Sequence, residues 1–98
     1  MAKPKLEDGE LRTALLGLKD WSVKEHKLHR EYKFPNFAHA FGFMTTCAFA
    51  IEKKNHHPEW FNSYNSVIVD LTTHDSGGIT GNDVELAHAM DTIAAKLA

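Results

Sequence analysis

The chain has 98 residues, the size of one compact domain, and we expect a single domain spanning 1–98. Its composition, with 43% hydrophobic and 24% charged residues, is that of an ordinary globular protein. The formal net charge of −2 gives no general attraction to nucleic acids or anionic membranes, so direct binding to either is not expected. The single cysteine, Cys47, excludes an intrachain disulfide and a cysteine-rich zinc site, and fits a reducing compartment.

Neither a signal peptide nor a membrane span is expected. The basic start Met1–Lys5 is followed by the acidic stretch Leu6–Glu10 instead of an apolar segment. The longest apolar-rich run, Ala40–Ile51, is shorter than the ~20 residues that cross a bilayer. A cytoplasmic location is the resulting expectation.

Hydrophobic periodicity predicts helices where apolar residues recur every three or four positions, and strands where they alternate. The predicted elements are a helix over 6–18, a β-hairpin over 21–34, a helix over 36–55, a β-hairpin over 59–73 and a helix over 81–97. Alternation places Leu28, Tyr32 and Phe34 on one face of the first hairpin, and Val67, Val69 and Leu71 on one face of the second. This order, α-β-β-α-β-β-α, predicts an α+β fold with a four-stranded antiparallel sheet and three helices on one face.

The long helix has an apolar stripe that we expect to face the core. The stripe consists of Phe37, Phe41, Met44, Ala48 and Ile51, widened by Ala40 and Cys47. Phe49 lies on the opposite side, among small residues. Such a residue suits a helix packed on a partner subunit, although a single exposed phenylalanine explains it equally well.

Three histidines lie where predicted elements end. His56 and His57 precede Pro58, which stops the long helix, and His74 follows the second hairpin. An imidazole with an unperturbed pKa of ~6.5 can give or take a proton near neutral pH. The three histidines therefore predict either proton-transfer chemistry or a metal site.

Among the possible chemistries, proton transfer fits these histidines better than a metal site or a nucleophile does. Adjacent histidines on a helix diverge by ~100°, no HExxH sequence is present and Cys47 falls in the core stripe, so the zinc ligand count is poor. No serine lies in a recognisable nucleophile elbow. Glu52 stands four residues before His56 and would share its helix face, which suits acid–base catalysis. Before any resemblance is considered, the residues alone favour a simpler explanation, in which His56-His57 is an exposed helix end and Glu52 is merely one of its charges.

Two fixed-spacing motifs resemble the signature of the pterin-4a-carbinolamine dehydratases. The first is Glu52-x3-His56-His57-Pro58-Glu59-Trp60-Phe61-x2-Tyr64-Asn65, and the second is Thr73-His74-Asp75-x-Gly77-Gly78-Ile79-Thr80-x2-Asp83. Upstream, Trp21, the hairpin ending at Phe34 and Phe37-x3-Phe41-Gly42-Phe43-Met44 are similar too, so the resemblance covers most of residues 6–95. It implies dehydration of 4a-hydroxytetrahydrobiopterin to quinonoid dihydrobiopterin, in tetrahydrobiopterin recycling, with no metal or other cofactor.

The resemblance also implies site residues. The family's active-site histidines fall on His56, His57 and His74, and its pterin-contacting segments fall on 55–57 and 72–75. We therefore expect catalytic roles for His56, His57, His74 and Glu52, and substrate contacts from Asn55, His56, His57, Thr72, Thr73, His74, Asp75 and Trp21. For Trp21, packing in the core is an equally good explanation. In this hypothesis His56 and His74 transfer protons, Glu52 supports His56, and His57 orients the pterin. Some family members carry Asp at position 55; Asn55 cannot ionise but can still form a hydrogen bond.

Two roles outside catalysis accompany this resemblance. Some family members act as dimerisation cofactors of a homeodomain transcription activator, which would add a nuclear location, and the family is often dimeric or tetrameric. A homodimer or homotetramer is therefore expected, and Phe49 suits such association. A catalytically silent structural protein is a further alternative. Asp83 matches a family position, but its spacing from Thr80 favours a helix-capping role.

Overall fold

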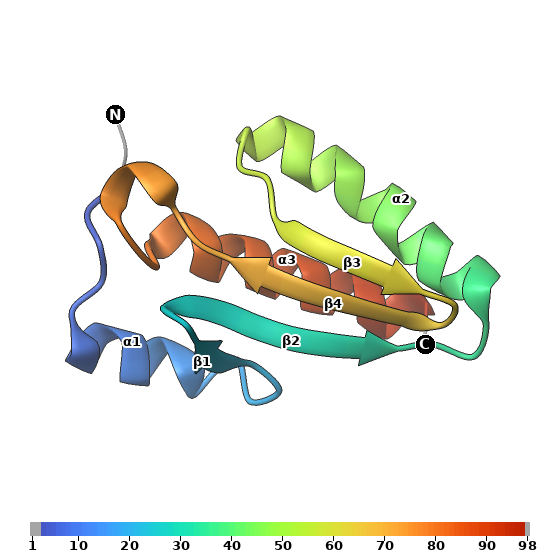
Figure 1. The fold of residues 1–98 in the computed structure, drawn as a ribbon, viewed down its shortest axis with the longest axis horizontal. Coiled ribbons are helices and arrows are strands. Elements are labelled where there is room, and N and C mark those ends of the chain that lie inside the picture. The colour runs from blue at the N-terminus through green and yellow to red at the C-terminus, as the bar shows by residue number, and fades with distance from the viewer. Residues whose placement is uncertain (1–2, 98) are drawn as a thin grey trace.

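The computed structural model describes residues 3–97 of the chain. In chain order the elements are α1 (Asp8–Leu15), β1 (Ser22–Lys24), β2 (Lys27–Lys33), α2 (Phe37–Lys54), β3 (Glu59–Ser63), β4 (Ser66–Leu71), the short 3-10 helix η1 (His74–Ser76) and α3 (Gly81–Leu97) (Figure 1). The predicted order of helices and strands is confirmed, and α1 is shorter than the predicted range 6–18. No helix within residues 3–97 has the length and apolar character needed to cross a bilayer.

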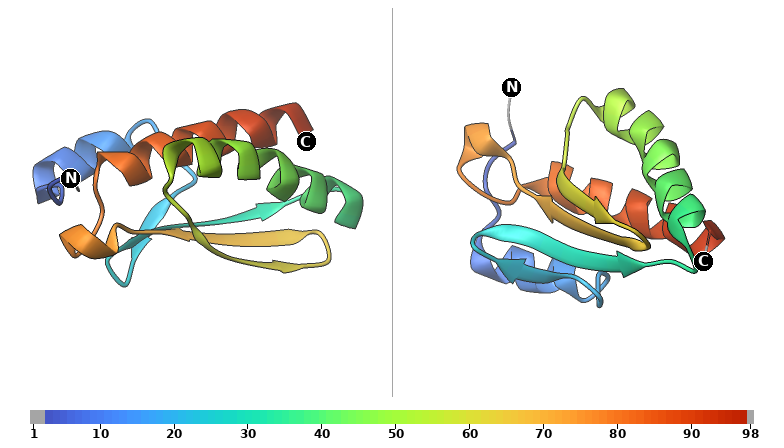
Figure 2. Two further views of the ribbon diagram at one scale, coloured as in Figure 1. Left: turned by 90° about the horizontal axis from the view of Figure 1, so that it is seen from above. Right: turned by 45° about the vertical axis from the view of Figure 1, so that its right-hand side comes forward.

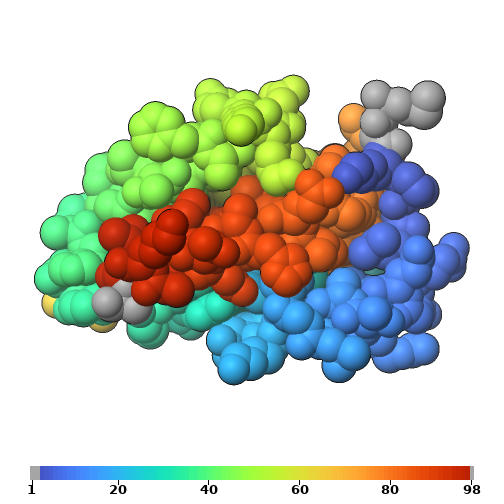
Figure 3. Space-filling model, turned by 180° about the vertical axis from the view of Figure 1, so that it is seen from behind, coloured from blue at the N-terminus to red at the C-terminus, as the bar shows by residue number. Residues whose placement is uncertain are grey.

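The strands form one antiparallel sheet in the order β1-β2-β4-β3. β4 lies between β2 and β3, so that Leu71 faces Leu28 on one side and Asp70 faces Glu59 on the other. Figure 2 shows the three helices on one face of this sheet, and Figure 3 shows α1, α3 and α2 lying side by side on that face. The predicted α+β architecture is thus confirmed, and no helix within residues 3–97 covers the opposite face of the sheet, which we call the open face.

The hydrophobic core lies between the sheet and the helices. Alternating residues of β2 and β4 enter it, because successive side chains of a strand point to opposite faces. Its strand residues include Leu28, Tyr32, Val67, Val69 and Leu71, and its helix residues include Ala40, Phe43, Cys47, Ile51, Leu86 and Met90. The predicted inward faces of both hairpins are confirmed. Burial raises the pKa of the Cys47 thiol to about 12.

The predicted core stripe of α2 is wrong in part. The buried residues of this helix are Ala40, Phe43, Cys47 and Ile51. Phe37 and Phe41 are 48% and 55% exposed, and Ala48 is also exposed. Spacings of three and four residues fit both the predicted stripe and the observed set of buried residues, which are offset by one position and share Ile51. Packing against the sheet and α3 selects between the two. Exposed Phe37, Phe41 and Phe49 are thus left on the outer surface of α2.

Candidate active site

Two chain segments meet at one end of the sheet and enclose a hollow. α2 ends at Lys54, and Asn55 then takes a left-handed conformation (φ 52°, ψ 42°), which asparagine tolerates better than most residues. β4 ends at Leu71 and leads into η1. The hollow has a volume of about 270 Å³ and is lined by Asn55, His56, His57, Thr72, Thr73, His74 and Asp75. Three imidazoles from segments distant in sequence therefore border one space.

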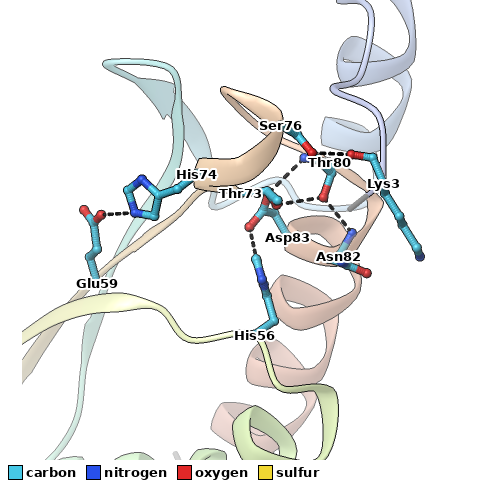
Figure 4. A network of polar contacts seen from close by, with 9 residues as sticks. All are labelled: Lys3, His56, Glu59, Thr73, His74, Ser76, Thr80, Asn82 and Asp83. Carbon is cyan, nitrogen blue, oxygen red and sulfur yellow. Dashed lines mark hydrogen bonds and ion pairs between the residues drawn. The ribbon is translucent and has the colours of Figure 1, made fainter. Parts of the chain in front are cut away.

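His56 is bonded to a buried carboxylate from α3. Its Nε2 lies 2.5 Å from Oδ1 of Asp83, a residue with no solvent-exposed surface (Figure 4). Since the carboxylate is an acceptor, the His56 ring places a hydrogen on Nε2 and leaves Nδ1 as its second polar atom. The contact fixes both the orientation and the tautomer of His56.

Asp83 is itself held by Thr73, which follows β4, and by Thr80, which precedes α3. Its Oδ2 accepts hydrogen bonds from the Thr73 hydroxyl at 2.8 Å and the Thr80 backbone N–H at 2.9 Å. The Thr80 hydroxyl lies 2.8 Å from that of Thr73 and accepts the Asn82 backbone N–H at 3.2 Å. The predicted capping role of Asp83 is confirmed. Its contact with His56 was not predicted, because the two residues lie 27 positions apart.

Glu52 pairs with His57, so the prediction that it supports His56 is wrong. The Oε2 atom of Glu52 lies 3.1 Å from Nε2 of His57, five residues along the chain. An i, i+4 contact with His56 requires the helix to continue, but the helix ends at Lys54 and Asn55 turns the backbone. Both Glu52 and His57 are exposed, so this pair restrains the His57 ring only weakly.

His74 sits at the first position of a closed turn. The backbones of Thr73 and Gly78 exchange two hydrogen bonds around η1. The N to O distances are 2.9 Å and 3.3 Å. Gly77 has φ +77°, which only glycine adopts readily, and Gly78 lies so close to the Lys5 side chain that a Cβ would be 2.6 Å from it. The segment 75–78 is therefore a defined turn that presents His74 at the edge of the hollow.

His74 also has a carboxylate partner, Glu59 on β3. Glu59 Oε2 lies 3.1 Å from His74 Nε2, and Glu59 Oε1 accepts a hydrogen bond of 2.6 Å from Lys27 Nζ. The hydrogen bond from Lys27 is the main cause that lowers the pKa of Glu59; desolvation opposes it, and the Lys27 charge and the His74 contact lower the pKa further. Each histidine of the hollow thus has its own carboxylate partner: Asp83, Glu52 or Glu59.

Trp21 lies outside the hollow, so the structure does not support its predicted contact with a pterin. It is buried, and its indole N–H donates to both carboxylate oxygens of Asp91, at 3.0 and 3.1 Å. Asp91 also accepts hydrogen bonds from Arg30 at 2.8 Å and from the Tyr32 hydroxyl. A larger hollow of about 390 Å³ borders this cluster and contains none of the three histidines.

The alternative of a metal site depends on how the possible ligands are arranged. No group of three or more His, Cys, Asp and Glu side chains within residues 3–97 is arranged to hold a metal ion. The hollow instead offers three imidazoles, the Thr72 and Thr73 hydroxyls and the Asn55 amide. Such groups can donate and accept hydrogen bonds and exchange protons with a small polar ligand.

Comparisons with known proteins match nearly the whole chain to one family. A family model described as pterin 4 alpha carbinolamine dehydratase matches residues 4–93. A Solibacter usitatus protein, named as a proposed pterin-4-alpha-carbinolamine dehydratase, is 56% identical over 91 residues, covering 93% of this chain and 96% of its own. A Rhizobium rhizogenes protein of the same name is 49% identical over 100 residues, covering 100% of this chain and 99% of its own.

A solved structure extends the similarity to three dimensions. The crystal structure of a transcriptional coactivator/pterin dehydratase from Brucella melitensis matches with a TM-score of 0.89 and 42% identity. The match covers 92% of this chain and 98% of the Brucella chain. The chain therefore belongs to the pterin-4-alpha-carbinolamine dehydratase family.

Proposed function

We propose that this protein dehydrates 4a-hydroxytetrahydrobiopterin to quinonoid dihydrobiopterin, as a step of tetrahydrobiopterin recycling. The observation that carries the proposal is the convergence of His56, His57 and His74 on one hollow at the end of the sheet. Family membership supports the same reaction. With a volume of about 270 Å³, the hollow suits a small bicyclic ring better than a large ligand.

The reaction requires one acid and one base. A general acid protonates the hydroxyl on C4a as the C–O bond breaks, and the oxygen leaves as water with the bonding electrons. A general base removes the proton from N5, and the electrons of the N–H bond form the new double bond between N5 and C4a. Nothing is oxidised or reduced overall, so two positioned imidazoles can supply both transfers, each worth ~10²–10⁴-fold in rate.

His56 and His74 are the proposed proton-transfer residues. Asp83 replaces Glu52 as the support of His56: a buried carboxylate fixes the His56 tautomer, so that Nδ1 is the atom available to the substrate. Glu52 acts through His57, whose proposed role is to bind and orient the pterin. Asn55, Thr72, Thr73 and Asp75 line the same hollow and complete the proposed binding surface.

Kinetics of single-histidine variants test this proposal. His56→Ala and His74→Ala should each lower kcat for pterin dehydration at least tenfold, because each removes a proton-transfer group. His88→Ala, an exposed histidine on α3 outside the hollow, is the matched control and should retain the wild-type rate. Circular dichroism should show intact folds. Unchanged rates in both His56→Ala and His74→Ala would refute the assignment.

Association into a homo-oligomer, and service as a dimerisation cofactor, form a second proposal. It rests on the outer surface of α2, where Phe37, Phe41 and Phe49 are 48%, 55% and 75% exposed. Burying large apolar side chains of this kind is the main driving force of most protein association. The Brucella relative is described as a transcriptional coactivator as well as a pterin dehydratase. That description favours a role in association with other proteins for this chain too.

A further inference from the structure

A lysine, a carboxylate and an imidazole are linked to one another beside the open face of the sheet. Lys27 comes from β2, Glu59 from β3, and His74 from the turn after β4. Neighbouring Leu28 is fully buried on the helix side, so strand alternation directs Lys27 to the open face. The Glu59 carboxylate joins the other two groups. One of its oxygens lies 2.6 Å from Lys27 Nζ, and the other lies 3.1 Å from His74 Nε2 (Figure 4).

We propose that Glu59 is a positioning residue for His74 and that Lys27 tunes its effect. The inference rests on the proposed function in assigning His74 to proton transfer. Glu59 holds the His74 ring at the edge of the hollow and stabilises its protonated form. Lys27 competes for the same carboxylate and therefore limits that stabilisation. Glu59 needs no contact with the substrate for this role.

The contacts of Glu59 and Lys27 support a shared, ionised carboxylate. Its hydrogen bond to Lys27, their charge attraction and the His74 contact lower the pKa of Glu59. The same hydrogen bond and nearby carboxylates raise the pKa of Lys27. Glu59 therefore remains negative, and Lys27 positive, throughout the pH range in which a histidine exchanges its proton.

Other ionisable groups lie around His74 but do not bond its ring. Among residues 3–97, Glu59 is the only hydrogen-bond partner of the ring. The ionisable groups of the neighbouring elements are His56, His57, Asp75, Lys5, Asp70 and His29. Asp70 lies opposite Glu59 in the sheet and is itself bonded to His29 at 2.8 Å. Glu59 is thus the carboxylate best placed to act on His74.

Two substitutions should move the titration of His74 in opposite directions. NMR can follow the ring protons of His74 against pH in the full-length protein. Glu59→Gln removes the negative charge, so the midpoint should shift to lower pH. Lys27→Gln removes the competing cation, so the midpoint should shift to higher pH. Both shifts should shrink at high salt, because these groups are partly exposed and salt screens them.

Glu31→Gln is the matched control. Glu31 lies on the same open face, and its carboxylate is also held by a lysine, Lys33 at 3.4 Å, and by Ser66 at 2.6 Å, but it does not contact His74. This variant should leave the His74 midpoint unchanged. Equal midpoints in wild type, Glu59→Gln and Lys27→Gln, or shifts of the same sign in both variants, would overturn the inference.

Kinetics separate this inference from the proposed function. Glu59→Gln should lower kcat several-fold, within about tenfold, and leave KM nearly unchanged, because the acid–base step depends on His74 while Glu59 does not bind the substrate. Glu31→Gln should have the wild-type kcat. Opposite midpoint shifts with an unchanged kcat would overturn Glu59 as a positioning residue for the reaction, whereas the role of His74 itself is decided by the rate of His74→Ala.

Discussion

Replacing Asp83 by asparagine should invert the tautomer of His56 while keeping the fold. In the wild type, Oδ2 of Asp83 accepts from Thr73 and from the Thr80 backbone, whereas Oδ1 accepts from His56. Asparagine has one oxygen, which should take the place of Oδ2 because two donors meet there. Its NH2 group then faces Nε2 of His56, which must become an acceptor. The ring hydrogen moves to Nδ1, the atom assigned to the substrate.

The expected cost in stability is moderate and the expected cost in rate is large. All three hydrogen bonds accepted by Asp83 change from charge-assisted, worth about 1.5–3 kcal/mol each, to neutral, worth about 0.5–1.5 kcal/mol each. Removal of a buried charge offsets part of this loss, so the free energy of unfolding should fall by about 1–3 kcal/mol, and Tm by about 4–8 °C per kcal/mol for a domain of this size. If His56 transfers a proton through Nδ1, the change of tautomer blocks that transfer and should reduce kcat by about 10²–10⁴-fold.

The assay combines urea unfolding, dehydration kinetics and ¹⁵N spectra of the imidazole rings, which report the tautomer. Asp91→Asn is the matched control, since Asp91 is also an α3 carboxylate bonded by three donors, none of them a histidine. This variant should lose stability but retain its kcat at temperatures where it is folded. A folded Asp83→Asn protein with wild-type kcat would refute the role assigned to His56 and Asp83.

Three further outcomes follow from the charges and the surface. Hydrogen bonds from Lys54 and Lys3 lower the pKa of Glu85 to about 2, so Glu85 stabilises the fold above the ordinary carboxyl pKa, and this contribution is lost as pH falls toward about 2. Glu85→Gln should therefore lower the free energy of unfolding at pH 7 by less than about 1 kcal/mol, seen as a slightly lower urea midpoint. Near pH 2 the variant and the wild type should have the same midpoint. Because the pKa of Cys47 is about 12, its thiol should resist a disulfide reagent at pH 8 until urea unfolds the protein. Phe49→Asp should reduce the mass measured by light scattering, whereas Leu16→Asp, an equally exposed apolar position on another face, should not; an unaltered mass would argue against association through α2.

Local pattern was sufficient to predict the strands and their inward faces. In β4, Val67, Val69 and Leu71 alternate with partly exposed residues, and a period of two leaves one choice of buried face. In α2 the same kind of argument failed, because apolar residues occupy more than one side of the helix. Which side is buried depends on how α2 meets the sheet and α3, and sequence spacing does not contain that information.

The histidines of the site could be predicted, but only one of their three carboxylate partners. Glu52 was recognised from its spacing, yet its partner was mistaken because the left-handed Asn55 turns the chain at the end of α2. Asp83 and Glu59 reach their histidines across 27 and 15 residues. These contacts depend on the docking of α3 and on the strand order β2-β4-β3, which follow from tertiary packing. Trp21 was assigned to the site from the family resemblance, whereas Asp91 holds it in the core.

An NMR titration with a dihydropterin tests the central claim most directly. If one pterin fills the hollow, the ring signals of His56, His57 and His74 should all shift with the same dissociation constant. The signals of His29, on the open face of the sheet, and His88, on α3, should stay in place. Shifts confined to one histidine, or three different dissociation constants, would contradict a single pterin site formed by these imidazoles.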